Sequence, residues 1–198
     1  NRGDEFVKVF LEKINISEEQ DLIDLSLIYA AMEGKLSLVN LLLEYGAQQF
    51  ATESESGNTA LTFACQEGYS EVVRALLEDL KAKEKVDIVN KVNRNQDTPL
   101  IKACGFGHVE IAKMLINFGA NYKILNKNGL GAIDYAYEIS NQNQLGATDD
   151  GSTRDIFREI MEEINKKDPR TAIAIRCIKE ASDSLASGSL ASGSLKRK

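Results

Sequence analysis

The 198-residue sequence is poor in the residue types that build metal centres and disulfide frameworks. It holds one histidine, His108, and three cysteines, Cys65, Cys104 and Cys177. A zinc site needs several histidine or cysteine ligands at short spacing, so we expect no metal centre. An odd number of widely spaced cysteines does not fit a secreted disulfide framework. We therefore expect reduced, buried thiols in an intracellular, cytoplasmic protein.

The sequence also lacks an excess of positive charge and a long apolar run. Its net charge of -6 disfavours nucleic acid or an anionic membrane as the main partner, because both favour clustered lysine and arginine. No apolar run approaches the ~18–20 residues that cross a bilayer. The residues after Asn1 show no basic-then-apolar signal segment. We predict neither a nucleic-acid partner nor a membrane partner.

Motifs for catalysis are missing as well. The sequence contains neither a glycine-rich phosphate-binding loop nor a Gly-x-Ser-x-Gly elbow. The adjacent carboxylates Glu18–Glu19 and Asp149–Asp150 are typical of solvated helix starts and loops rather than of an acid–base pair. We expect no enzyme activity and no cofactor in these residues.

What the sequence does contain is an internal repeat. Residues 97–112, DTPLIKACGFGHVEIA, recur in altered form as residues 58–73, NTALTFACQEGYSEVV. Gly34, Gly68 and Gly107 mark the same break in three units and are separated by 34 and 39 residues. A turn, a short helix, a glycine break and a second helix that recur along a chain predict a stacked, all-α solenoid.

The third unit shows why these residue types stand at this spacing. Thr98 is placed to cap the first helix with its hydroxyl, and Pro99 takes the first helical position, where a missing N–H costs nothing. Leu100 and Cys104 then share one helix face, and Gly107 permits the left-handed turn before the second helix. Each helix pair buries only part of its apolar surface alone, so we expect the units to stack.

Three runs in the third unit stand in register: Thr98-Pro99-Leu100, Gly107-His108 and Gly119-Ala120-Asn121. With the neighbouring units they resemble ankyrin repeats. The resemblance covers roughly residues 25–140, as about three full units and a degenerate fourth. It implies an all-α ankyrin solenoid of helix-turn-helix units with hairpin loops, and a structural role for His108.

Further helices are expected on both sides of the repeats. The second unit is longer than the others, and the spacing of Asp79 and Lys83 favours an extended helix there. We predict an N-terminal capping helix in residues 1–16, ankyrin repeats in 17–140, a polar insertion in 141–151, C-terminal capping helices in 152–185 and a low-complexity tail in 186–198.

The resemblance also implies a binding surface, because ankyrin repeats bind proteins through their hairpin tips and the exposed inner face of their first helices. We expect the chain to be monomeric alone and to bind a protein or peptide there. On the tips the implied residues are Glu55, Asn58, Arg94, Asn95, Asp97, Lys127, Asn128 and Leu130. On the inner helical face they are Met32, Glu33, Gln66, Glu67, Phe106 and Tyr137.

Phe106 is an aromatic residue at a slot that is usually polar. Two interpretations stay open: its ring anchors a partner, or it folds against Tyr69 or Tyr137 and seals the surface. The acidic residues of the first two units predict basic character in the part of the partner that faces them.

A second hypothesis is a translocated bacterial effector, or a targeting subunit whose ankyrin repeats steer a larger protein. The Ser-, Leu- and Gly-rich residues 184–198 faintly resemble C-terminal secretion signals of such effectors. A linker explains the same composition. An effector would act in the cytoplasm of its host.

Overall fold

The computed structural model describes Lys8 and residues 19–145 and 156–170. The chain divides into a larger unit that ends at Ile160 and a smaller one that begins at Met161. Apart from Lys8, the predicted N-terminal capping helix lies outside the described residues, as does the predicted tail. Residues 171–185 of the predicted C-terminal caps lie outside them too.

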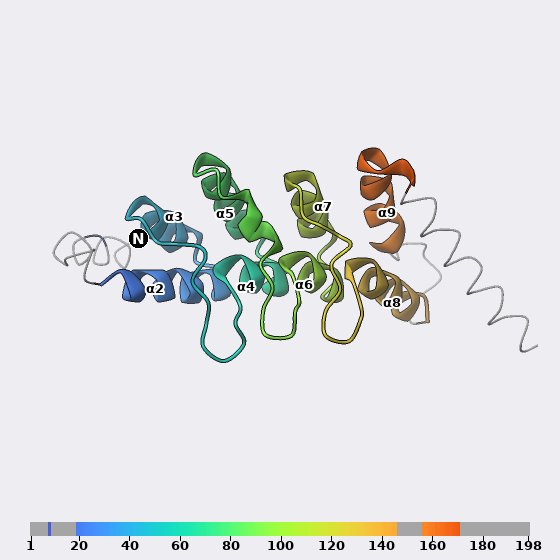
Figure 1. Ribbon diagram of the computed structural model, residues 1–198, viewed down its shortest axis with the longest axis horizontal. Coiled ribbons are helices and arrows are strands. Elements are labelled where there is room, and N and C mark those ends of the chain that lie inside the picture. The colour runs from blue at the N-terminus through green and yellow to red at the C-terminus, as the bar shows by residue number, and fades with distance from the viewer. Residues whose placement is uncertain (1–7, 9–18, 146–155, 171–198) are drawn as a thin grey trace, which may run out of the picture. The chain divides into compact units, whose positions relative to one another are not determined.

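The larger unit consists of helices joined in pairs (Figure 1). Their order confirms the all-α solenoid of helix-turn-helix units, and the described part of the chain holds one isolated β-bridge, Leu125 with Gly131, and no strand. The pairs are α2 (Gln20–Met32) with α3 (Leu36–Glu44), α4 (Ala60–Glu67) with α5 (Ser70–Ala82), and α6 (Pro99–Gly105) with α7 (Val109–Phe118). The 3-10 helix η1 (Val86–Asn90) follows α5, and α8 (Ala132–Leu145) and α9 (Ile156–Lys167) come last.

The helices form two layers. Helices α2, α4, α6 and α8 lie side by side in one layer, and α3, α5 and α7 lie in the other (Figure 1). We call the first set the inner helices and the second set the outer helices. Leucines such as Leu61, Leu76, Leu100 and Leu115 are fully buried between the layers. The hairpin loops extend beyond the inner helices, so they and the inner helices share one exposed side.

Threonine caps start two inner helices, as the repeat pattern predicts. Thr59 Oγ1 accepts a hydrogen bond from the Thr62 N–H at 3.2 Å, and Thr98 Oγ1 accepts one from the Ile101 N–H at 3.1 Å. Each bond satisfies a backbone donor that the first turn of a helix leaves unpaired. Pro99 follows its threonine at the first helical position, as expected.

The fourth unit lacks both the threonine cap and the break glycine of the earlier units. Gly131 replaces the threonine, and the Asp134 carboxylate accepts the Gly131 N–H at 3.0 Å instead. Ser140 stands where Gly107 reverses the chain in the third unit. With no glycine to stop it, α8 continues to Leu145. Residues 141–145, the start of the predicted polar insertion, are therefore helical.

The extended helix of the second unit is confirmed. Helix α5 continues to Ala82, and Lys83 Nζ lies 2.9 Å from Asp79 Oδ1 at its end. Helix α9 forms within the predicted range of the C-terminal caps. Neither α9, which is twelve residues long, nor any other described helix is long and apolar enough to span a bilayer.

Candidate partner-binding face

The tips of the hairpin loops are linked to one another through the backbone. The Arg94 N–H donates to the Ser56 carbonyl at 3.0 Å, and the Lys127 N–H donates to the Asn95 carbonyl at the same distance. Each bond joins one hairpin to the next. Because consecutive tips are tied in this way, their exposed side chains form a row of fixed spacing. The predicted residues Glu55, Arg94, Asn95, Lys127 and Asn128 are all exposed in it.

A second row of bonds lies at the base of the hairpins and is buried. Asn93 Nδ2 donates to Asn58 Oδ1 at 2.8 Å, and Asn126 Nδ2 donates to Asp97 Oδ1 at 2.9 Å. Lys102 Nζ also lies 3.1 Å from Asp97 Oδ2. The expectation that Asn58 and Asp97 face a partner is therefore wrong. Their side chains are buried because each holds the hairpin of the following unit in place.

The asparagines of this row also shape their own turns. Asn93 Oδ1 accepts the N–H groups of Asn95 and Asp97, each at 2.9 Å. Asn126 Oδ1 accepts the corresponding N–H groups of Asn128 and Leu130 at 2.9 and 3.1 Å. Two consecutive hairpins therefore have one geometry, which makes the exposed tip residues equivalent from unit to unit. Leu130 is half-buried at the end of its turn.

Glu53 shapes the first hairpin in a different way. Its carboxylate accepts the Ser56 N–H at 2.7 Å, the Glu55 N–H at 2.5 Å and the Ser56 hydroxyl at 2.8 Å. These bonds stabilise the charged form, and they lower the pKa of Glu53 to about 2. The first hairpin therefore keeps its negative charge well below neutral pH.

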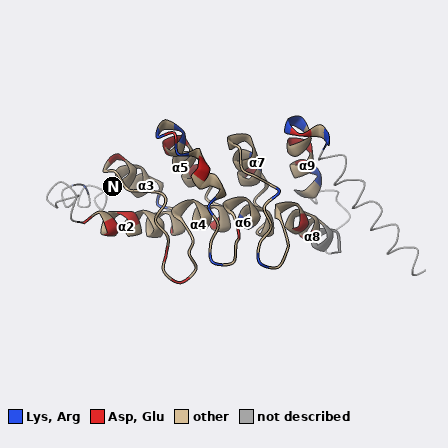
Figure 2. Cartoon of the chain, viewed as in Figure 1, with Lys and Arg blue, Asp and Glu red and all other residues tan. Residues whose placement is uncertain are grey.

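Charge changes sign along the row of tips. Figure 2 shows the first hairpin in red, where Glu53 and Glu55 stand, and blue at the following two tips, where Arg94 and Lys127 stand. The row is thus acidic at its start and basic further along the stack. A charged ligand would meet opposite potentials at the two ends of the row.

The inner helices carry the second part of the exposed surface. Glu33, Glu67, Phe106 and Ile139 occupy equivalent positions in four successive units. The two glutamates are exposed, and Phe106 is 56% exposed, the largest fraction among the large apolar residues of the described chain. Met32 and Gln66, one position earlier in their units, are half-buried. Phe106 is therefore not sealed under its neighbours.

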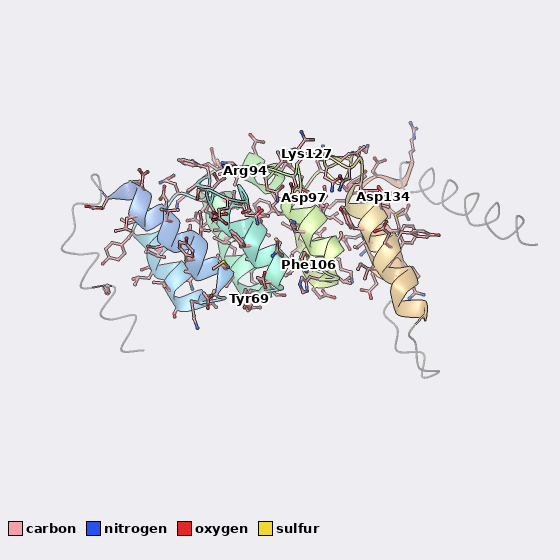
Figure 3. The ribbon with its side chains drawn as sticks, turned by 90° about the horizontal axis from the view of Figure 1, so that it is seen from below. Tyr69, Arg94, Asp97, Phe106, Lys127 and Asp134 are labelled. Carbon is pink, nitrogen blue, oxygen red and sulfur yellow. The ribbon has the colours of Figure 1, made fainter. Side chains whose placement is uncertain are left out.

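Figure 3 shows how the two parts lie. Arg94 and Lys127 lie along one edge of the side formed by the inner helices, and Phe106 lies towards the opposite edge. Helix α6 separates them and is seven residues long, which is about 10 Å. We call the exposed set Glu33, Glu55, Glu67, Arg94, Asn95, Phe106, Lys127 and Asn128 the inner face.

Comparison with known proteins accounts for this architecture. A family model of three ankyrin repeats matches residues 1–88, and a second ankyrin-repeat model matches residues 71–116. The chain belongs to the ankyrin-repeat family. Ankyrin repeats mediate protein–protein interaction.

Several relatives match the chain over only a small part of their own length. Alpha-latrocrustotoxin-Lt1a of Latrodectus tredecimguttatus is 32% identical over 127 residues, which are 64% of this chain and 8% of the toxin. An E3 ubiquitin-protein ligase of Arabidopsis thaliana is 36% identical over 102 residues, 52% of this chain and 6% of the ligase. The ankyrin repeat and KH domain-containing protein mask of Drosophila melanogaster is 43% identical over 99 residues, 48% of this chain and 2% of that protein. The chain thus matches a small part of each.

Tyr137 does not lie where the ankyrin pattern was expected to place it. Its slot matches that of Cys104, a buried residue, and its ring packs edge-on against Phe157 of α9, with the ring centroids 5.4 Å apart. Tyr137 is half-buried there. The fourth ankyrin unit therefore uses this residue for packing, and we leave it out of the inner face.

Sequence reasoning missed an aromatic position on the same side of the ankyrin stack. Tyr29, Phe63, Lys102 and Tyr135 are equivalent residues, four positions before Glu33, Glu67, Phe106 and Ile139. Tyr29 is 54% exposed, Phe63 is half-buried, and Tyr135 accepts a hydrogen bond from Asn126 at 3.1 Å. Residues four positions apart lie side by side on one helix face, so Tyr29 lies beside Glu33 and Phe63 lies beside Glu67. This spacing is visible in the sequence. Tyr29 and Phe63 therefore extend the apolar part of the inner face.

His108 has the structural role that the ankyrin pattern implies. Its Nε2 lies 3.0 Å from the Gln66 carbonyl oxygen of the preceding unit. Its ring covers Gly68 so closely that a Cβ there would lie 2.5 Å from His108 Cε1. Tyr69 covers Gly34 in the same way, because a Cβ on Gly34 would lie 2.8 Å from the Cδ1 and Cε1 atoms of the Tyr69 ring. Tyr69 and His108, which follow the break glycines of the second and third units, thus each lock their unit to the one before.

The described residues show no grouping of acids, histidine and cysteine that could hold a metal. The thiols of Cys65 and Cys104 are fully buried in equivalent slots of α4 and α6. Burial raises the pKa of Cys65 well above its usual range and that of Cys104 to about 12. Both stay protonated at neutral pH and fill space in the stack.

Proposed function

We propose that this chain is a non-catalytic module that binds a protein or peptide on its inner face. The exposure of Phe106 is the observation that supports this most strongly. A large aromatic side chain that the fold leaves in contact with water, on the side where ankyrin repeats bind, is suited to fill an apolar site on a partner. Tyr29 and Phe63 widen the apolar area on the same side.

The order of charges specifies the chemistry of the partner. Glu33, Glu55 and Glu67 belong to the first two units, whereas Arg94 and Lys127 belong to the later hairpins. A segment that lies along the inner face is best matched if it is basic towards the first units and acidic towards the later ones. Between these ends it needs an apolar side chain for Phe106. Such complementarity sets orientation and association rate more than affinity.

We also propose that the module works in the cytoplasm, where thiols such as those of Cys65 and Cys104 remain reduced. The toxin and ligase activities named above are those of the relatives. For this chain we propose binding, with no reaction assigned to the ankyrin repeats.

A displayed library of random peptides tests the proposal. Peptides are selected on the wild-type chain and then depleted on a Phe106→Ala/Arg94→Glu variant. We expect the surviving sequences to carry a large apolar residue between a basic and an acidic end. Val86→Ala, a change at an exposed apolar residue of η1, is the matched control and should retain the peptides. If depletion removed nearly all of the selected peptides, because they bind the double variant as tightly as the wild type, the inner face would be refuted as the binding surface.

Charge exchange tests the orientation separately. For a selected peptide, Glu55→Lys and Lys127→Glu should each weaken binding, and added salt should reduce both losses. A peptide of the same composition with its charged ends exchanged should bind more weakly to the wild type. Equal binding of the two peptides would contradict the proposed order of charges while leaving Phe106 as an anchor.

A further inference from the structure

Each of the four described ankyrin units presents one aromatic residue on the side of the inner helices. Tyr29, Phe63 and Tyr135 stand at the same slot of α2, α4 and α8. In the third unit that slot holds Lys102, and the aromatic residue stands one turn later as Phe106. We call Tyr29, Phe63, Phe106 and Tyr135 the aromatic row.

The aromatic row is open to a ligand. Tyr29 is 54% exposed and Phe106 is 56% exposed, whereas Phe63 and Tyr135 are half-buried. Phe106 lies on the exposed side of the inner helices in Figure 3. The Tyr135 ring lies against Gly105, the residue before Phe106, because a Cβ on Gly105 would be 3.5 Å from Tyr135 Cδ1. The third and fourth units therefore bring two aromatic residues close together.

The spacing of the row is that of the stacked helices. Packed helices lie about 8–10 Å apart, so the units present their rings at about this interval along the stack. On an α-helical ligand, neighbouring anchors are about 5–6 Å apart and a seven-residue repeat takes about 10.5 Å. In a β-strand the side chains return to one side after about 6.6 Å. A polyproline II helix has three residues per turn and rises about 3.1 Å per residue, so its side chains return to one side after about 9.3 Å. Of these intervals, the polyproline II interval matches the row.

Polar groups beside the row suit the same kind of ligand. A polyproline II segment makes no internal hydrogen bonds, so its carbonyl groups need donors from a partner or from water. Asn126 Nδ2 donates to the Tyr135 hydroxyl at 3.1 Å, and the hydroxyl proton is then available to a carbonyl group of the ligand. The exposed side-chain amides of Asn95 and Asn128 are further donors, along the hairpin tips.

We propose that the partner of the inner face is a proline-rich segment in the polyproline II conformation. Its prolines, at every third position, stack on the aromatic row. The acidic first units hold its basic end, and Arg94 and Lys127 hold its acidic end. Because such a segment is extended before it binds, it loses little conformational entropy on the row. This proposal rests on the proposed function and adds the composition and conformation of the partner.

Two displayed libraries test the spacing. The first has proline fixed at every third position, and the second has the same number of prolines fixed in one block, with all other positions random in both. Peptides are selected on the wild-type chain, and those that also bind the Phe106→Ala/Arg94→Glu variant are removed. We expect inner-face binders to come from the first library at least about tenfold more often. A synthesised binder should show the circular dichroism of polyproline II.

Variants of the chain test the row itself. Tyr29→Ala should weaken a selected proline peptide by about five- to tenfold, because one ring contact is lost. Phe50→Ala is the matched control and should leave binding unchanged. Phe50 is 49% exposed but stands outside the inner helices, where Lys85 Nζ lies 5.6 Å from its ring centroid. Both rings are exposed, so neither change should alter the Tm.

Truncation of the peptide tests its register on the stack. Without the proline nearest its basic end, the peptide should bind the wild type and Tyr29→Ala equally, because Tyr29 belongs to the first unit. The truncated peptide should still be weakened by Phe106→Ala. Loss of both effects at once would contradict a fixed register.

The remaining outcomes overturn the proposal. Inner-face binders drawn equally from the two libraries would show that the row does not recognise this spacing. Equal affinities of the wild type and Tyr29→Ala for the complete peptide would exclude the row as its binding surface. If an unrestricted library yields inner-face binders that become α-helical when bound, the proposed function stands and this proposal fails. If no peptide from any library depends on Phe106 and Arg94, both fail.

Discussion

At the scale of single residues, side chains that hold the repeats together stand close in sequence to side chains that are free to contact a partner. Within residues 97–108, Asp97 and His108 hold neighbouring units, and Phe106 stands between them and faces solvent. The sequence predicts the roles of Thr98 and Pro99 because those roles depend on local backbone geometry. The structural role of His108 is implied by the resemblance to ankyrin repeats, because its ring contacts Gln66 and Gly68 of the preceding unit. It could not predict the burial of Asp97, because the partner of that carboxylate, Asn126, comes from the next unit.

Phe106→Ala should weaken a ligand of the inner face by about 1–2 kcal/mol, since it removes the apolar anchor. Folding stability should change by less than about 0.5 kcal/mol, because the residue is exposed. Isothermal titration with a selected peptide, beside denaturant unfolding, measures both. Unchanged affinity together with lost stability would assign Phe106 to packing.

Gly68→Ala should destabilise the stack through two effects. The residue has a φ of +83°, and a Cβ would collide with the His108 ring. Gly129→Ala is the control, because Gly129 has a φ of +75° but no atom near its Cβ position. We expect Gly68→Ala to cost at least about 1 kcal/mol more than the control in denaturant unfolding. Equal costs would mean that the His108 ring moves aside freely.

At the scale of elements, each helix pair depends on its neighbours for burial. The sequence predicts the inner helices well, because threonine caps and break glycines mark their ends. It does not show that α8 continues through residues 141–145, because no threonine cap or break glycine marks the end of that helix. Buried bonds such as Asn93 to Asn58 join elements from different units, and neither spacing nor polarity reveals such pairs.

Leu100→Ala should lower the free energy of unfolding by about 2–5 kcal/mol, because it leaves a cavity between α6 and its neighbours. Leu125→Ala removes the same atoms from an exposed residue and should have little effect. Urea unfolding followed by circular dichroism compares the two. Similar losses for both variants would contradict the position of the core between the two layers.

Glu53→Gln should change the acid stability of the first hairpin. The folded-state pKa of Glu53 is lowered from 4.5 to about 2, so its contribution is complete above pH 4.5 and is lost as the pH falls towards 2. The wild type should therefore have the higher Tm at pH 6, and the difference should shrink below pH 4.5. Calorimetry from pH 6 to pH 3 follows it. A difference that stays constant with pH would rule out the carboxylate as its source.

At the scale of the whole molecule, the repeats form a stack in which each unit contacts its neighbours. Such a stack provides an extended surface, and in the function we propose the binding depends on which side chains it holds exposed together. The family pattern predicts which side that is, because ankyrin repeats use one side for binding. The pattern cannot predict the acidic-to-basic order of the tips or the exposure of Tyr29, which depend on residues that vary between units.

The central claim is that the partner binds the inner face. Backbone amide shifts of the isotope-labelled chain, recorded by NMR during titration with a selected peptide, test it most directly. We predict that the largest shifts occur at Phe106, at the tips with Arg94 and Lys127, and along α4 and α6. Shifts concentrated on the outer helices α3, α5 and α7 would contradict the account.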